Sequence, residues 1–292
     1  MKRTILLTAV KIVAVCLIVV GIFVLMYPTM TDMVYQRKVY RQKEIFYSTY
    51  SENETEQSKT DQLYEELVYQ NKRLYQTEQS SLSDPFSYEQ AEYDLGDYGL
   101  EDNVIGFVSI PKIDVELPLI LGASEENLAL GAAHLTNTTY PVGGENTNCV
   151  IAAHRGFSKT AMFRNLDELS VGDEIYITNF RETLTYRVSE TLLILPCDVD
   201  ELKIVKGKDM VTLFTCAPYR SNTHRLLVRC ERVYNDDLPI AESCADIQRQ
   251  SEIKLWIGSE YVHVPIWCFV IAAVLIIVIA SCVIIRRVVK KH

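Results

Sequence analysis

Two long apolar segments constrain this chain more than any other feature of its sequence. Residues 5–27 are apolar apart from Thr8 and Lys11, and residues 264–285 contain no charged side chain. A helix of about 20 apolar residues is long enough to cross the hydrocarbon core of a bilayer. We therefore predict a transmembrane anchor within residues 1–27 and a second transmembrane helix at 264–285. The first segment is long and no small-x-small cleavage site follows it, so an anchor is favoured over a cleaved signal peptide.

Basic side chains beside both apolar segments predict how the chain is oriented. Lys2 and Arg3 precede the first segment, and four Lys and Arg residues lie in the tail at 286–292. Basic flanks stay in the cytoplasm, so both termini are expected there and the region between the segments faces outward. A basic group at 37–43 argues the other way, but the charge-free second segment with its basic tail outweighs it. The prediction is a two-pass protein of the cell membrane with an extracellular domain.

The region between the segments is strongly acidic. Seven of the 29 Lys and Arg residues lie within or beside the apolar segments, which leaves 22 against 38 Asp and Glu residues, a net charge of −16. Such a charge repels phosphate backbones, so we expect no nucleic-acid partner.

Residues 28–100 form the first part of this outer region and are mostly polar. Leu63, Leu67 and Leu74 recur at helical spacing, which predicts a helical stalk with one apolar face. A coiled coil is the alternative, but the apolar stripe is short for one. The motif SSLSDPFSY at 80–88 then breaks the pattern with serines and a proline.

Residues 101–235 are built from about eight short β-rich runs separated by turns. The segments SEENLAL and TAMFRNLDEL are expected to form short helices between the strands. This pattern is typical of an all-β barrel or sandwich. The acidic residues 236–263 then form a tether that leads to the second transmembrane helix.

The stretch TLFTCAPYRSNTHRLLVRC at 212–230 places a thiol and a guanidinium at the facing ends of two apolar runs. Cys216 ends the first run, and Arg225 begins the second run nine residues later. His154 also follows an apolar run, in CVIAAHRGF. A Cys–His pair supplies a nucleophile and a general acid/base, and an arginine can stabilise an oxyanion. We therefore predict Cys216 as nucleophile, His154 as general acid/base and Arg225 as oxyanion or substrate ligand, although no Asp or Asn partner for His154 is evident.

The other histidines and cysteines have structural interpretations. His134 is expected to be a hydrogen-bonded structural histidine. His224 adjoins Arg225, and neighbouring strand residues face opposite ways, so only one of the two can face Cys216. The remaining outer cysteines are interpreted as core or small apolar side chains: Cys149, Cys197, Cys230 and Cys244. Their spacing matches no zinc pattern, so we expect neither a metal nor a cofactor.

The motif TLFTC, with an arginine nine residues after its cysteine, resembles the TLxTC signature of the sortases, the transpeptidases of Gram-positive bacterial surfaces. AAHRG resembles the histidine segment of that family, and further segments resemble it in order over about 100–234. The resemblance implies an eight-stranded sortase-type β-barrel. It is strongest to class C, the pilus-assembling sortases, because of Pro218 and Tyr219 after the nucleophile, the second C-terminal span and the DPF motif at 84–86.

In class C sortases a DP-aromatic motif belongs to a lid, so the resemblance assigns Asp84, Pro85 and Phe86 to such a lid. Asp84 would pair with Arg225, and Phe86 would cover Cys216. The resemblance also places Thr215 and Ala217 at the substrate groove. Ala217 departs from a common threonine, and Cys230 departs from a common glycine.

The resemblance further implies the reaction and its partners. Cleavage of an LPxTG-like sorting signal between Thr and Gly would pass through a thioester, and a pilin lysine would resolve it as an isopeptide bond. One alternative is an anchoring sortase, which joins surface proteins to a peptidoglycan precursor. A more remote alternative is a membrane-tethered binding module without activity.

Overall fold

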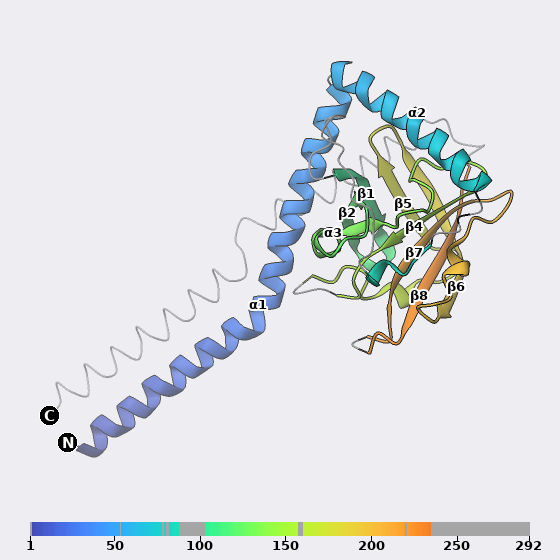
Figure 1. Cartoon of the computed structure of the whole chain (residues 1–292). Coiled ribbons are helices and arrows are strands. Elements are labelled where there is room, and N and C mark those ends of the chain that lie inside the picture. Colours follow the sequence, from blue (N-terminus) through green and yellow to red (C-terminus); the bar gives the residue numbers. More distant parts are fainter. Residues whose placement is uncertain are drawn as a thin grey trace. The chain divides into compact units, whose positions relative to one another are not determined.

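The computed structural model describes residues 2–52, 54–77, 79, 82–87, 103–156, 160–219 and 221–234 (Figure 1). The chain divides into two compact units, one of residues 1–28 and 235–292 and one of residues 29–234. The predicted tether, second transmembrane helix and basic tail lie outside the described residues.

The N-terminal part of the chain is helical, as the apolar anchor and the leucine spacing predict. Helix α1 runs from Lys2 to Glu52 and helix α2 from Glu54 to Gln76. Among the described residues, one helical stretch, Ala14–Phe46, is long and apolar enough to cross a membrane.

Helix α2 packs its apolar face on the β-rich part of the chain. Leu63 and Leu67 are buried in the same core cluster as residues of the strands. Asn71 ties the helix down further, because its Nδ2 donates to Tyr140 O at 3.2 Å and its Oδ1 accepts from Tyr140 N at 2.7 Å. Leu63 and Leu67 are thus buried against the barrel of the same chain and are not exposed for the coiled coil considered above.

Eight strands in the described part of the chain form a closed barrel in the order β1-β2-β3-β4-β7-β8-β6-β5 (Figure 1). The strands span Val104–Ile110 (β1), Val115–Leu121 (β2), Ala132–His134 (β3), Thr147–Ala152 (β4), Glu174–Asn179 (β5), Thr183–Ile194 (β6), Asp209–Ala217 (β7) and His224–Arg232 (β8). The predicted all-β barrel is confirmed. Seven of these strands match runs in the sequence, whereas β3 has three residues and is too short to show an alternating pattern.

One of the two predicted short helices is confirmed and the other is mostly wrong. SEENLAL contains helix α3, Glu125–Leu130, with Ser124 as its N-cap. In TAMFRNLDEL the structure has only the 3₁₀ turn η5, Leu166–Glu168. The backbone N–H of Phe163 donates to His154 O at 3.0 Å, so it pairs across the fold and not along a helix.

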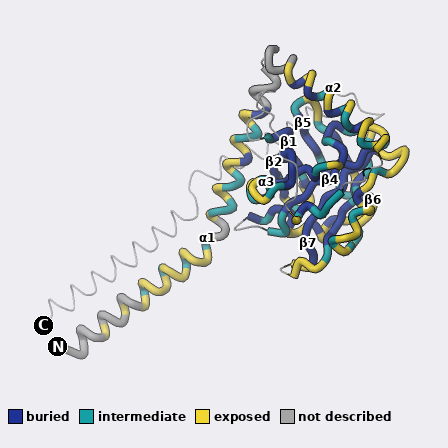
Figure 2. Tube along the Cα trace, viewed as in Figure 1, coloured by how far each residue is buried: buried dark blue, intermediate teal, exposed yellow. Residues whose placement is uncertain are grey.

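Two apolar clusters cover opposite faces of the strands that carry the candidate site. Along β7, Leu213 belongs to the larger cluster, which draws on all eight strands, and Phe214 belongs to the second. Successive strand residues point to opposite faces, so the larger cluster fills the barrel and the second covers its outer face. The second cluster also includes residues of α3 and of the 3₁₀ turn η6, Val199–Leu202. Figure 2 shows the strands as the most buried part of the fold.

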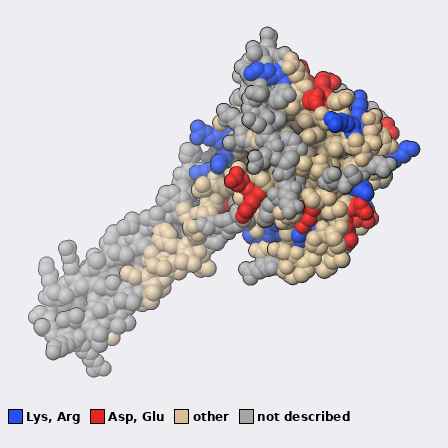
Figure 3. Space-filling model, in the orientation of Figure 1, with Lys and Arg blue, Asp and Glu red and all other residues tan. Residues whose placement is uncertain are grey.

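Charged side chains on the visible face of the molecule are of mixed sign (Figure 3). Some charged side chains of the described part form exposed ion pairs, such as Arg187 with Glu174 at 2.9 Å and Lys203 with Asp200 at 2.6 Å. Exposed pairs of this kind contribute about 0–1 kcal/mol each. The stability of the barrel therefore comes mainly from its apolar clusters.

Candidate active site

Cys216 and Arg225 face each other across two neighbouring strands. They are direct partners in the antiparallel register of β7 and β8. Both residues are mostly buried, with exposed fractions of 8 % for Cys216 and 7 % for Arg225. Directly opposite residues in an antiparallel pair project on the same face, so the thiol and the guanidinium share one side of the sheet.

His154 lies at the same level on the other side of β7. Strand β4 runs parallel to β7 and pairs Ala152 with Phe214. The pairing continues past the end of β4, because Ala153 N donates to Phe214 O at 3.1 Å. Continuing this register by two residues brings His154 beside Cys216. The fold therefore brings together the three residues that the sequence singled out.

Thr215 and Ala217 flank the candidate nucleophile but are buried. The Thr215 hydroxyl donates to Ala153 O at 2.8 Å, which fastens β7 to the segment before His154. Ala217 belongs to the cluster inside the barrel. Both side chains thus point away from Cys216, and their part in a substrate groove stays a prediction.

Asp84 engages Arg225 from a distant part of the sequence. The guanidinium Nε donates to Oδ1 at 3.0 Å and Nη2 donates to Oδ2 at 2.6 Å. The remaining nitrogen, Nη1, donates to the backbone oxygens of Asn222 and His224 at 2.9 and 3.0 Å. All three guanidinium nitrogens of Arg225 thus donate hydrogen bonds in this structure.

Phe86 lies over the site from the same segment, which forms the 3₁₀ turn η1, Pro85–Ser87. Its ring centroid is 5.5 Å from that of His154 and 6.1 Å from that of Phe214. The guanidinium carbon of Arg225 is 5.5 Å from the centre of the same ring. The aromatic ring therefore contacts both groups that flank Cys216.

Burial keeps the two candidate reacting groups neutral. It raises the pKa of the Cys216 thiol, an effect that Arg225 opposes and Asp84 reinforces. Burial also lowers the pKa of His154, against a smaller opposing effect of Glu125. In this arrangement the thiol and the neutral imidazole are favoured over the thiolate–imidazolium pair.

His134 has the environment of a structural histidine. It is fully buried, and its Nε2 lies 3.3 Å from Thr138 O and 3.2 Å from Thr139 O. Its ring stacks on Tyr140 with centroids 5.0 Å apart. Burial lowers the pKa of His134 to about 4, so it stays neutral near pH 7.

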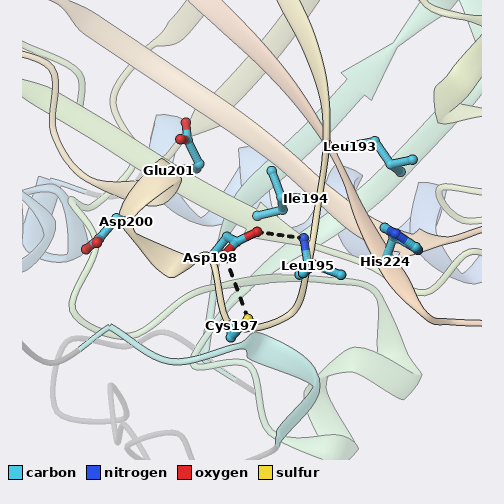
Figure 4. A pocket seen from close by; sticks show the side chains of 8 residues that line it. All are labelled: Leu193, Ile194, Leu195, Cys197, Asp198, Asp200, Glu201 and His224. Atoms are coloured by element: carbon cyan, nitrogen blue, oxygen red, sulfur yellow. Dashed lines mark hydrogen bonds between the residues drawn. The ribbon is translucent and has the colours of Figure 1, made fainter.

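His224 faces a different hollow from Cys216. It lines a cavity of about 550 Å³, shown in Figure 4. Residues from the end of β6 and from the following turn form the rest of the lining: Leu193, Ile194, Leu195, Cys197, Asp198, Asp200 and Glu201. The expectation that only one of His224 and Arg225 faces Cys216 is met, and it is Arg225.

The other described cysteines of the outer region are free thiols without a place at the site. Cys149 and Cys230 are buried, and burial raises the pKa of each. Cys197 is exposed beside Asp198. Cys244 lies outside the described residues.

Two residues that act on the site carry no signal in the sequence. Leu82 packs with Phe86 against the outer apolar cluster. Glu125 is the carboxylate that acts on His154. Both act on residues far away in the chain, and no local motif marks such a contact.

Comparisons with known proteins agree with this geometry. The family model described as the sortase domain matches residues 108–233. Sortase A of Bacillus anthracis is 32 % identical over 127 residues, which cover 43 % of this chain and 58 % of that protein. Sortase D of Bacillus subtilis (strain 168) is 30 % identical over 114 residues, covering 39 % and 54 %. The chain thus spans about half the length of these curated relatives.

Solved structures match over more of the chain. Sortase C1 of GBS pilus island 1 is 34 % identical with a TM-score of 0.60, and the match covers 69 % of this chain and 95 % of that one. Sortase C of Streptococcus pneumoniae is 34 % identical with a TM-score of 0.59, covering 66 % and 97 %. Because the chain covers almost all of these sortase structures at 34 % identity, and because the sortase-domain model matches its barrel, the chain belongs to the sortase family.

Proposed function

We propose that this protein is a membrane-anchored class C sortase that joins pilin subunits. It would cleave an LPxTG-like sorting signal between Thr and Gly and transfer the acyl group to a lysine amine. The observation that carries this proposal is the register of β4, β7 and β8, which aligns His154, Cys216 and Arg225. The similar structures named sortase C, one of them from a pilus island, support the choice of class.

In the first step Cys216 Sγ, as thiolate, attacks the carbonyl carbon of the threonine. His154, as imidazolium, gives its proton to the glycine nitrogen as the C–N bond breaks. Arg225 donates to the oxyanion of the tetrahedral intermediate, where fixed donors are most effective. The products are a thioester on Cys216 and a free amino-terminal glycine.

In the second step the lysine Nζ attacks the thioester carbon. His154, now neutral, accepts the proton from the amine, and Cys216 leaves as the thiolate. The acyl group ends in an isopeptide bond, and the enzyme returns to its starting state. No step requires a cofactor or a metal ion.

Residues 82–87 would act as a lid over this site. In the closed position Asp84 occupies the Arg225 donors that the oxyanion needs, and Phe86 covers the space between His154 and Arg225. The substrate would have to displace the lid before the first step. The closed lid would also protect the thiol from oxidation, to which exposed thiolates are prone.

Membrane anchoring is supported by helix α1, within which the stretch Ala14–Phe46 is long and apolar enough to cross a membrane. We infer a second anchor at residues 264–285 from their length and lack of charge. The basic flanks would hold both termini in the cytoplasm, which places the barrel outside the cell.

An anchoring sortase is the alternative. The contacts of Asp84 and Phe86 with the site favour the class C function. The two functions differ in the amine that resolves the thioester.

The test is to incubate the detergent-solubilised chain with an LPxTG peptide and two competing acceptors. One acceptor is a peptide with a single lysine, and the other is a peptidoglycan stem-peptide amine. Mass spectrometry should show the isopeptide product with lysine in excess. Preference for the stem-peptide amine would favour the anchoring function, and an unmodified peptide would contradict both.

A further inference from the structure

We propose that Gln79 is a positioning residue that anchors the base of the lid to two connections of the barrel. The proposal rests on the lid function of residues 82–87 given above. It assigns a role to a residue that contacts neither Cys216 nor Arg225 in this structure.

The side chain of Gln79 joins two distant parts of the barrel. Its Nε2 donates to Asn137 O at 3.0 Å, in the β3–β4 connection. Its Oε1 accepts from Ile204 N at 2.7 Å, in the β6–β7 connection. Gln79 is only 4 % exposed, so both ends of its amide are used in a buried place. If the Gln79 side chain is removed, Asn137 O and Ile204 N each lose a hydrogen-bond partner in a buried place, which is costly.

The backbone conformation of Gln79 also indicates that this residue is held in place. Its φ of 48° lies in the left-handed region, where residues other than glycine are uncommon. Such a conformation persists when the surrounding contacts over-determine it. The hydrogen bonds to Asn137 and Ile204 are contacts of this kind.

The position of Gln79 sets the length of the tether that holds the lid. Gln79 precedes Asp84 by five residues. Without this anchor, the nearest fixed points are the end of α2 at Gln76, eight residues from Asp84, and Asn71 on Tyr140, thirteen residues away. The probability of closing a flexible loop falls as about the −3/2 power of its length, so lid closure would become about two- to fourfold less favourable.

The same anchor couples the lid to one wall of the site. Ile204 follows η6, whose Val199 and Leu202 belong to the outer apolar cluster against which Leu82 and Phe86 pack. Asn148 holds this connection from strand β4, because its Nδ2 donates to Leu202 O at 3.0 Å. Gln79 therefore connects the base of the lid to the β6–β7 connection, whose turn η6 forms part of the surface that the lid covers.

The test compares Gln79→Ala with Gln76→Ala, which replaces an exposed glutamine at the end of helix α2. The full-length chain in detergent is treated with iodoacetamide, and alkylation of each cysteine is followed by peptide mass spectrometry. Cys197 is exposed, so its alkylation does not require the lid to open, and it serves as the internal reference. The ratio of Cys216 to Cys197 alkylation rates should rise about two- to fourfold in Gln79→Ala, from the same loop-length scaling, and stay unchanged in Gln76→Ala.

A second variant covers the case in which Gln79→Ala does not fold. Gln79→Met keeps the length of the buried side chain but can neither donate to Asn137 O nor accept from Ile204 N, so a rise of the same size is expected. An unchanged ratio in a folded Gln79 variant, when lid substitutions at Asp84 and Phe86 do raise it, would overturn the anchor and leave the proposed function intact. An unchanged ratio in the lid variants as well would remove the lid itself, and the anchor with it.

Discussion

Asp84 holds Arg225 through two parallel hydrogen bonds, at 3.0 and 2.6 Å, although the residues lie 141 positions apart. The side chains are 15 % and 9 % exposed, so the pair is largely shielded from water. An exposed pair would contribute about 0–1 kcal/mol, whereas hydrogen bonds to charged groups contribute about 1.5–3 kcal/mol. Asp84 is thus held more firmly than a surface ion pair would hold it, and in the proposed lid it would withhold the donors of Arg225 from an oxyanion.

Replacing both Asp84 and Phe86 with alanine should open the lid. Cys216 would then react faster with a thiol reagent, and hydrolysis of an LPxTG peptide would rise, because the site is uncovered without loss of a reacting group. The melting temperature of the barrel should change little. Equal labelling rates of Cys216 in the double variant and the native chain would rule out the lid.

The charge of Asp84 should be visible in the pH dependence of Cys216 alkylation. Asp84 raises the pKa of this thiol, so removing its charge in Asp84→Asn lowers that pKa and lets the thiolate form at lower pH. The midpoint of the pH–rate profile should therefore shift toward lower pH. Asp198→Asn, a substitution beside Cys197, is the control and should leave the Cys216 profile unchanged. A shift toward higher pH in Asp84→Asn would contradict this electrostatic assignment.

The nucleophile can be identified by single substitutions. Cys216→Ala should abolish cleavage of the sorting-signal peptide, and a thioester should be trapped on the native chain by mass spectrometry. Substitutions of three other outer cysteines should keep most activity: Cys149→Ala, Cys197→Ala and Cys244→Ala. Residual cleavage by the Cys216 variant at the native rate would mean that the mechanism is wrong.

His154→Ala and Arg225→Ala should each reduce kcat/KM by orders of magnitude. A positioned general acid/base alone contributes about 10²–10⁴-fold. His224→Ala should have a mild effect, because that side chain lines a separate cavity. An active His154 variant beside an inactive His134 variant would show that the wrong histidine had been chosen.

His134 should make the stability of the barrel depend on pH. Its pKa in the folded chain is about 4, below the ordinary value of 6.5, so the unfolded chain binds the proton more readily. Its contribution is complete above about pH 6.5 and is lost as the pH falls toward 4, in total about 3 kcal/mol. In His134→Gln, which retains a donor but does not titrate there, the melting temperature should fall less between pH 7 and pH 5. An identical pH dependence in both chains would contradict the assignment.

Features that depend on local pattern could be predicted from the order of the amino acids alone. The alternating runs predicted seven of the eight strands, and the leucine spacing predicted helix α2. The spacing of Cys216 and Arg225 followed from one hairpin, since a turn between two adjacent strands fixes which residues face each other.

Features that depend on distant segments became visible only in the folded barrel. The parallel register of β4 and β7 places His154 beside Cys216, and no local signal encodes a parallel pairing across 62 positions. Likewise, the burial of the Asp84–Arg225 pair and the anchoring of Gln79 arise from contacts across 141, 58 and 125 positions. Such contacts form only when the closed barrel and its outer apolar cluster bring these segments together, because each isolated segment lacks the partners that bury and pair its polar groups.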